Sequence, residues 1–116
     1  MTLFLTKSVI EVEFKSQGFV LKTQRQIVKD FNRSGIDFNA KFSLEELKYD
    51  QMIFEIRSKL IEVMKFGEAQ LLQLLYQIDV PQSHFTTLLE NPNISDELSE
   101  LILRREAYKV YLRSKF

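Results

Sequence analysis

Residues that could carry out catalysis are scarce in this sequence. Its 116 residues include one histidine, His84, and no cysteine, so a nucleophile–histidine dyad would have to use His84. Ser83 precedes His84, but neighbouring residues of a helix point about 100° apart and do not face each other. We therefore expect His84 to be a structural side chain and the protein to have no enzymatic activity.

Paired carboxylates make only a weak case for a metal ion. Glu46 and Asp50 are four residues apart, which places them on one face of a helix. No histidine follows at the spacing that completes a carboxylate–histidine metal motif in a helical bundle. The three scattered glycines cannot form a phosphate-binding loop. We expect no metal and no cofactor.

Basic residues give the strongest signal for binding. In the segment 19–34, four of them recur at spacings of three, four and four residues, which lines them along one side of a helix. In the segment 96–114, three more recur every four residues, with Tyr108 and Tyr111 nearby. Two such stripes could contact phosphates, and exposed tyrosines could stack on bases. The candidate phosphate contacts are Lys22, Arg25, Lys29, Arg33, Arg105, Lys109 and Arg113.

Each stripe also has a simpler interpretation as the solvated side of an amphipathic helix. Sixteen Lys and Arg balance sixteen Asp and Glu, so net charge gives no general attraction to nucleic acid or to an anionic membrane. We therefore expect a non-enzymatic interaction module that self-associates, for example as a homodimer, or binds a protein partner. Nucleic-acid binding through the two stripes is the alternative, and no membrane partner is expected.

A leucine-rich run suggests a partner motif at first sight. The residues LLQLL, which begin at Leu71, have the spacing of an LxxLL box, a helical plug that docks into grooves of partner proteins. Such a box needs exposed leucines on an otherwise polar helix. Here Ala69, Leu72, Tyr76 and Ile78 add apolar residues to the remaining sides, so the helix is expected to be buried core.

The composition is that of a single globular domain, 1–116. Hydrophobic residues make up 45% and charged residues 28% of the chain, which favours a packed core over disorder. The absence of cysteine excludes disulfides and fits the cytoplasm. The first residues lack the basic and apolar regions of a signal peptide, and no apolar run reaches the roughly 18 residues that a membrane span needs.

Periodicity predicts an all-α fold, a bundle of about five helices. Apolar residues recur at helical spacing from Phe19 onward, and three Gly with two Pro allow few turns. Before Phe19, alternation of Ile10, Val12 and Phe14 with glutamates also permits a strand, or an arm swapped onto a second chain. The expected helices are 3–17 (with those alternatives), 19–34, 44–66, 68–78, 81–90 and 96–114.

Local signals predict where these helices begin and end. Gly35 is placed to end one helix in a left-handed conformation, with Ile36 returning to contact Phe31. Ser43 and Glu46 have the spacing of a capping box at the start of the next helix. Gly67 interrupts the following helix, and Pro81 and Ser95 are expected to begin the last two.

Three strings resemble a group of small, uncharacterised helical proteins of Bacteroidota. They are KTQRQIVKDF, LLYQIDVP and ELILRREAYKVYLRSKF, which extend over most of the chain from Lys22 onward. The resemblance implies a helical protein of bacterial origin. It implies no activity and no site, because none of the strings is a motif with assigned chemistry.

Overall fold

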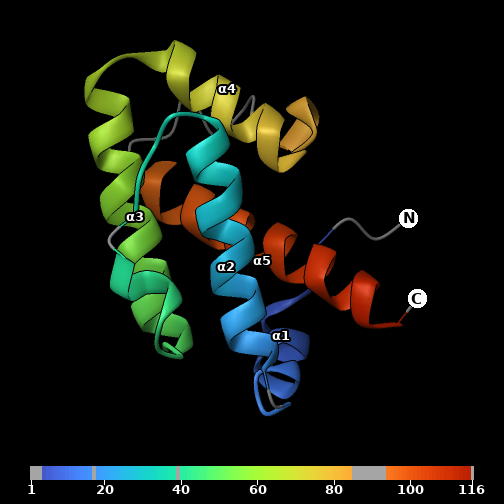
Figure 1. The fold of residues 1–116 in the computed structure, drawn as a ribbon. Coiled ribbons are helices and arrows are strands. Elements are labelled where there is room, and N and C mark those ends of the chain that lie inside the picture. The colour runs from blue at the N-terminus through green and yellow to red at the C-terminus, as the bar shows by residue number, and fades with distance from the viewer. Residues whose placement is uncertain (1–3, 17, 39, 85–93, 116) are drawn as a thin grey trace.

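The computed structural model describes residues 4–16, 18–38, 40–84 and 94–115. Within these residues the chain is all-α and contains no strand, which confirms the predicted fold class (Figure 1). Two 3₁₀ turns accompany the α-helices within these residues. In chain order the elements are α1 (Lys7–Glu13), α2 (Phe19–Arg33), η1 (Ala40–Ser43), α3 (Tyr49–Lys65), α4 (Glu68–Ile78), η2 (Gln82–His84) and α5 (Ile94–Lys115).

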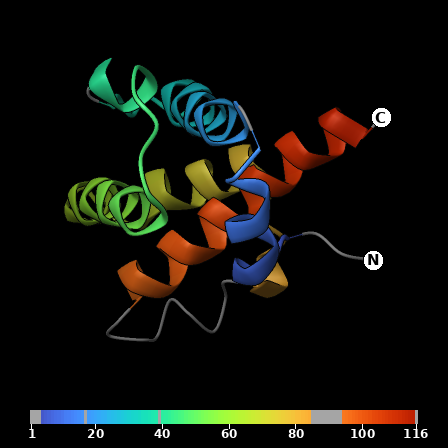
Figure 2. The ribbon, with the colours of Figure 1, turned by 90° about the horizontal axis from the view of Figure 1, so that it is seen from below.

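Helix α5 runs through the middle of the molecule and packs against the other four α-helices. Its first half lies beside α3 and its second half passes α2, while α4 crosses at one end of the bundle (Figures 1 and 2). The side chains of Leu98, Ile102 and Leu103 on α5 are completely buried. They join one apolar cluster that draws residues from every α-helix. The core of the molecule is therefore organised around α5.

Helix α2 ends where its sequence predicts. Val20, Ile27 and Phe31 are buried along one face. Gly35 has φ +79°, a left-handed conformation that glycine adopts without a Cβ clash. The Ile36 N–H donates to the Phe31 carbonyl at 2.9 Å, which closes the expected helix-ending motif.

Helix α3 begins five residues later than predicted, at Tyr49, and the Ser43 capping box is not formed. Residues 40–43 form the 3₁₀ turn η1 instead, and the Lys48 N–H donates to the Gln51 side chain at 2.9 Å. The cause is Gln24 of α2, which is completely buried. Its amide donates to the carbonyls of Phe42 and Glu45, and its oxygen accepts from the Leu47 N–H. The backbone groups of Phe42, Glu45 and Leu47 thus form hydrogen bonds with Gln24 and not with a helix of their own.

Gly67 separates α3 from α4, as expected, with φ +108°. In the LLQLL run, Leu71, Leu74 and Leu75 are buried, which confirms that the LxxLL leucines belong to the core. The expectation of burial on all sides is wrong: Tyr76 is 87% exposed and Leu72 is 38% exposed. Helix α4 lies at an end of the bundle, so only one of its faces meets other helices (Figure 1).

The N-terminal segment is helical from Lys7 to Glu13, so the strand alternative is wrong. The Thr6 hydroxyl accepts from the Val9 N–H at 3.3 Å and caps the helix. Preceding it, Leu5 exchanges two hydrogen bonds with Arg104 of α5. Within this chain, the segment therefore packs against α5.

The expected helix 81–90 is described only in part. Residues 82–84 form the 3₁₀ turn η2, and the remainder of that prediction lies outside the described residues. Helix α5 begins at Ile94, so Ser95 lies within its first turn and is not its cap. In the described part of the chain, no helix combines the length and the apolar character needed to cross a membrane.

Candidate functional site

The basic stripe predicted on 19–34 lies on the solvent side of α2. Lys22, Arg25, Lys29 and Arg33 are all exposed, whereas the opposite side of the helix is buried. At about 100° per residue, the four side chains leave the helix within an arc of about 80°. Apolar residues such as Ile27 and Phe31 fix which side faces the core. The rotation of α2 thus places all four cations in solvent.

The three cations of the stripe predicted on 96–114 do not share one surface. Arg113 is exposed near the end of α5. Arg105 turns to the C-terminal end of α4, where its guanidinium lies 2.9 Å from the Asp79 carboxylate. Lys109 turns inward, and its Nζ lies 2.8 Å from both Asp30 and Glu106. Two of the three cations of the predicted stripe are thus paired with carboxylates, and Arg113 remains.

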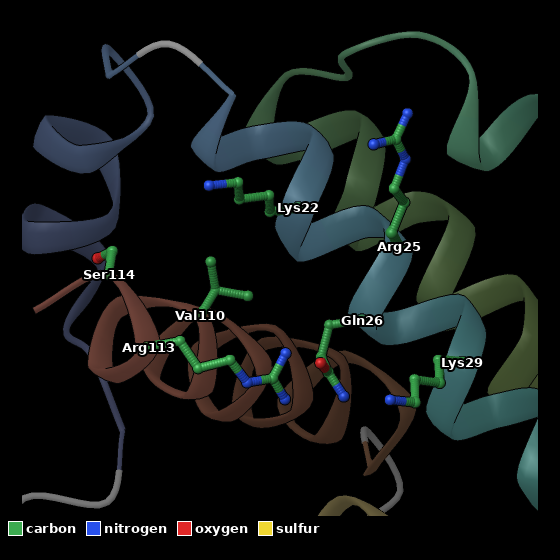
Figure 3. Close-up of a pocket in the computed structure, with 7 residues that line it drawn as sticks. All are labelled: Lys22, Arg25, Gln26, Lys29, Val110, Arg113 and Ser114. Carbon is green, nitrogen blue, oxygen red and sulfur yellow. The ribbon is translucent and has the colours of Figure 1, made fainter. Parts of the chain in front are cut away.

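A hollow of about 390 Å³ brings Arg113 together with three cations of α2. Lys22 and Lys29 extend from α2 into the space beside α5, and Arg113 extends from α5 toward Gln26 (Figure 3). Arg25 lines the hollow from α2 and points away from α5. The lining residues are Lys22, Arg25, Gln26, Lys29, Val110, Arg113 and Ser114.

A second hollow, of about 600 Å³, lies on the other side of α2, toward η1. It shares Arg25 and Lys29 with the first hollow and adds Arg33. Its lining residues are Arg25, Val28, Lys29, Asn32, Arg33 and Ser43. Neither lining set contains a carboxylate. We name the surface formed by Lys22, Arg25, Lys29, Arg33 and Arg113 the basic face.

None of the five cations of the basic face forms an ion pair with another described residue. Elsewhere in that part of the chain, Arg57 pairs with Asp96 and Lys59 pairs with Glu62, in addition to the pairs of Arg105 and Lys109. Like charges gathered in hollows raise the local potential and attract counter-ions of the opposite sign. The basic face is therefore suited to bind anions although the whole chain has no net charge.

Beside the first hollow, three titratable side chains meet between α2 and α5, and two of them are buried. Asp30 on α2 is 2% exposed and Glu106 on α5 is completely buried. Lys109 donates to Asp30 Oδ2 at 2.8 Å, and the Gln26 amide donates to the same oxygen at 3.1 Å. The cluster joins the two helices whose cations form the basic face.

Burial and hydrogen bonding drive the two carboxyls in opposite directions. Burial raises the pKa of Glu106 well above 4.5, despite the opposing charge of Lys109. Burial also acts to raise the pKa of Asp30, but hydrogen bonds from Glu106, Lys109 and Gln26 outweigh it and lower that pKa below 3.8. Burial thus favours the protonated form of Glu106, whereas the hydrogen bonds favour the ionised form of Asp30. Without that proton, both oxygens of Glu106 would be buried and lack a hydrogen-bond donor of good geometry.

The cluster has no access to a substrate. Neither Asp30 nor Glu106 lines either of the two hollows beside α2. His84 is exposed on η2, where its ring contacts Phe4 edge to face at 4.9 Å. Within the described ranges, no group of three or more His, Asp or Glu side chains is placed to hold a metal ion. The basic face is therefore the site that the geometry favours.

The sequence indicated the cations but not the acidic pair. Asp30 stands beside Phe31, and Glu106 stands among Leu103, Ala107 and Val110. A charged residue on an otherwise apolar face is the signal that could have revealed a buried ion cluster, since a buried charge needs a partner. Neither Tyr108 nor Tyr111 lines the two hollows, because both pack partly buried against the core.

Comparison with known proteins supplies no relative. No protein-family model, no curated protein and no solved structure matches the chain.

Proposed function

We propose that this protein is a non-enzymatic binding module whose basic face binds the phosphate backbone of nucleic acid. The observation that carries the proposal is the convergence of five exposed cations from α2 and α5, none in an ion pair with another described residue, on hollows whose lining contains no carboxylate. The proposal includes a cytoplasmic location, in keeping with a sequence that contains no cysteine.

The chemistry of the five side chains suits phosphate. Arginine binds phosphate oxygens through a planar fork and lysine through a compact charge. Each phosphate contact releases condensed counter-ions, so affinity falls with salt. If all five cations contact phosphates of duplex DNA, the plot of log affinity against log salt has a slope of about −4.5, at about −0.9 per contact.

The salt dependence of binding tests this proposal. Fluorescence anisotropy with a generic DNA duplex, repeated at rising NaCl concentration, gives both the affinity and the slope. Lys22→Ala combined with Arg113→Ala should weaken binding and make the slope less steep by about 2. Lys65→Ala is the matched control, because Lys65 is an exposed lysine in the last turn of α3 that lines neither hollow. Absence of binding at low salt would overturn the proposal.

A second candidate, a protein partner or a second copy of the chain, is favoured by a different observation. Several large apolar side chains remain exposed: Phe54 and Ile61 on α3, Phe66 at its C-terminal end (83% exposed), and Tyr76 on α4 (87% exposed). Exposed apolar groups of this size are typical of interaction surfaces when they are contiguous.

Solution mass distinguishes self-association from the other functions. Light scattering at micromolar concentration should give a mass above 13.8 kDa if the chain pairs with itself. Phe66→Ser combined with Tyr76→Ser should then return the monomer. A strictly monomeric wild-type protein would rule out self-association and leave nucleic-acid binding unaffected.

A further inference from the structure

We infer that α2 enters the major groove of B-form DNA, with Arg25 and Lys29 toward the base edges and Lys22, Arg33 and Arg113 on the flanking phosphates. This inference rests on the proposed function and adds to it the class of nucleic acid and the way it is held.

Helix α2 forms a ridge between two hollows. Arg25 and Lys29 line both hollows, so they lie on the crest that separates them. Along the crest, Lys22 lies toward the N-terminal end and Arg33 toward the C-terminal end of α2, and Arg113 of α5 flanks it across the first hollow. A cationic ridge with a hollow on each side is the shape that fits a groove with a phosphate chain along each wall.

The dimensions agree with a B-form major groove. An α-helix with its side chains is about 10–12 Å wide, and the major groove is about 12 Å wide. From Lys22 to Arg33 the helix advances about 16 Å at about 1.5 Å per residue. That distance corresponds to about five steps of about 3.4 Å along one DNA strand. The row of cations thus has the length of half a turn of duplex.

Other nucleic acids fit the surface less well. The major groove of an RNA duplex is deep and too narrow for side chains to read. Single strands are usually held by aromatic side chains that stack on bases. No aromatic residue lines either hollow beside α2. The surface offers charge and a ridge but no stacking platform, which favours a DNA duplex.

The helix is held rigidly from both sides. Asp30 of α2 is hydrogen bonded to Lys109 of α5, and Gln24 of α2 is hydrogen bonded to the backbone at 42–47. These contacts fix both the rotation and the position of α2 before any ligand arrives. A ridge positioned in advance loses little conformational entropy when it binds.

A comparison of four probes tests the inference: a DNA duplex, the RNA duplex of the same sequence, the single DNA strand and heparin, all at one low salt concentration. We expect the DNA duplex to bind at least about tenfold more tightly than the RNA duplex or the single strand. Equal affinity for the three nucleic acids would overturn groove entry and leave the proposed function standing. Failure to bind any of the four would overturn both.

Groove-specific competition locates the helix. A minor-groove ligand should leave binding unchanged, whereas methylation of guanine N7 in the major groove should weaken it severalfold; the reverse pattern would overturn the inference. Arg25→Lys keeps the charge and removes the fork that reads base edges. It should reduce the preference for duplex DNA over heparin while the salt slope stays the same. Lys22→Arg is the matched control at a flanking position and should leave that preference intact.

Discussion

At the scale of single residues, neighbours decide what each cation on α5 does. Lys109 and Arg113 are four residues apart on one helix and carry the same charge. Lys109 lies between Asp30 and Glu106 with its side chain 17% exposed, whereas Arg113 lies exposed beside the first hollow. The difference arises because α2 places the Asp30 carboxylate beside Lys109, whereas the α2 residues that line the hollow with Arg113 include no carboxylate. Residue type and spacing alone therefore could not separate the binding cation from the structural one.

Glu106 makes the stability of the protein depend on pH. Its pKa in the folded protein is raised above 4.5 by burial, so the folded state holds this proton more tightly than the unfolded chain. The contribution of this carboxyl is fully present below about pH 4.5 and is lost as pH rises through the folded pKa. We expect Glu106→Gln, which mimics the protonated acid, to be more stable than wild type at pH 8. Each tenfold difference in proton affinity is worth about 1.4 kcal/mol.

Urea unfolding at several pH values measures this effect. Asp30 contributes with the opposite sign, because its folded pKa lies below 3.8 and its stabilisation is lost as pH falls through that value. The gain of Glu106→Gln should therefore grow between pH 5 and pH 8. Glu100→Gln, at an exposed position of the same helix, should show no such trend. A variant less stable than wild type at pH 8 would contradict a protonated Glu106.

At the scale of elements, the sequence predicted which segments are helical more reliably than it predicted where each helix begins. The apolar repeats of α2, α3 and α5 are local, so periodicity found them. Gly35 and Gly67 act through their own backbone angles, so both breaks were also predictable. The start of α3 was not, because Gln24 fixes the backbone at 42–47 through hydrogen bonds between residues 18 to 23 positions apart. Ser43 and Glu46 had the right spacing for a cap, but a longer-range contact overrode it.

Gln24→Ala should destabilise the protein by roughly 1–3 kcal/mol, because it leaves the carbonyls of Phe42 and Glu45 and the N–H of Leu47 without their partner. Urea unfolding measures the loss of stability, and amide hydrogen exchange shows which part of the chain loses protection. The Leu47 N–H should exchange faster while the centre of α5 stays protected. Gln73→Ala, an exposed glutamine on α4, should have little effect. An unchanged Leu47 exchange rate would mean that Gln24 does not fix this loop.

The leucines of α4 allow a matched comparison between core and surface on one element. Leu74 is completely buried, whereas Leu72 is 38% exposed. Leu74→Ala should cost about 2–5 kcal/mol through lost burial and a residual cavity. Leu72→Ala should cost clearly less, since part of its side chain already contacts water. Thermal or urea unfolding of both variants measures the difference. Equal losses would contradict the one-sided burial of α4, and a fully stable Leu74→Ala protein would return the LxxLL run to consideration as a partner motif.

At the scale of the whole molecule, a chain with no net charge separates its charges in space. The α2 part of the basic face could be predicted from the sequence, because helical spacing places Lys22, Arg25, Lys29 and Arg33 on one side. Which of the three predicted cations of α5 would join them could not, because the pairing of Lys109 and the position of Arg113 depend on how α5 crosses α2. The hollows likewise arise from packing between elements distant in sequence. The structure is therefore needed to define the site, although all five of its cations are among the seven candidates that the sequence indicates.

The positive charge of the basic face gives a final prediction, which concerns the thermal stability of the whole folded protein. A polyanion that binds only the folded state stabilises it by about 2.7 kcal/mol at a hundred times its dissociation constant. For a chain of this size, each kcal/mol raises Tm by roughly 4–8 °C. Heparin at low salt should therefore raise Tm by about 10 °C or more, measured by circular dichroism, and 0.5 M NaCl should abolish the increase. Arg25→Glu combined with Lys29→Glu should remove the heparin effect, while Lys65→Glu should retain most of it. A heparin effect that survives reversal at Arg25 and Lys29 would place the anion site elsewhere on the molecule.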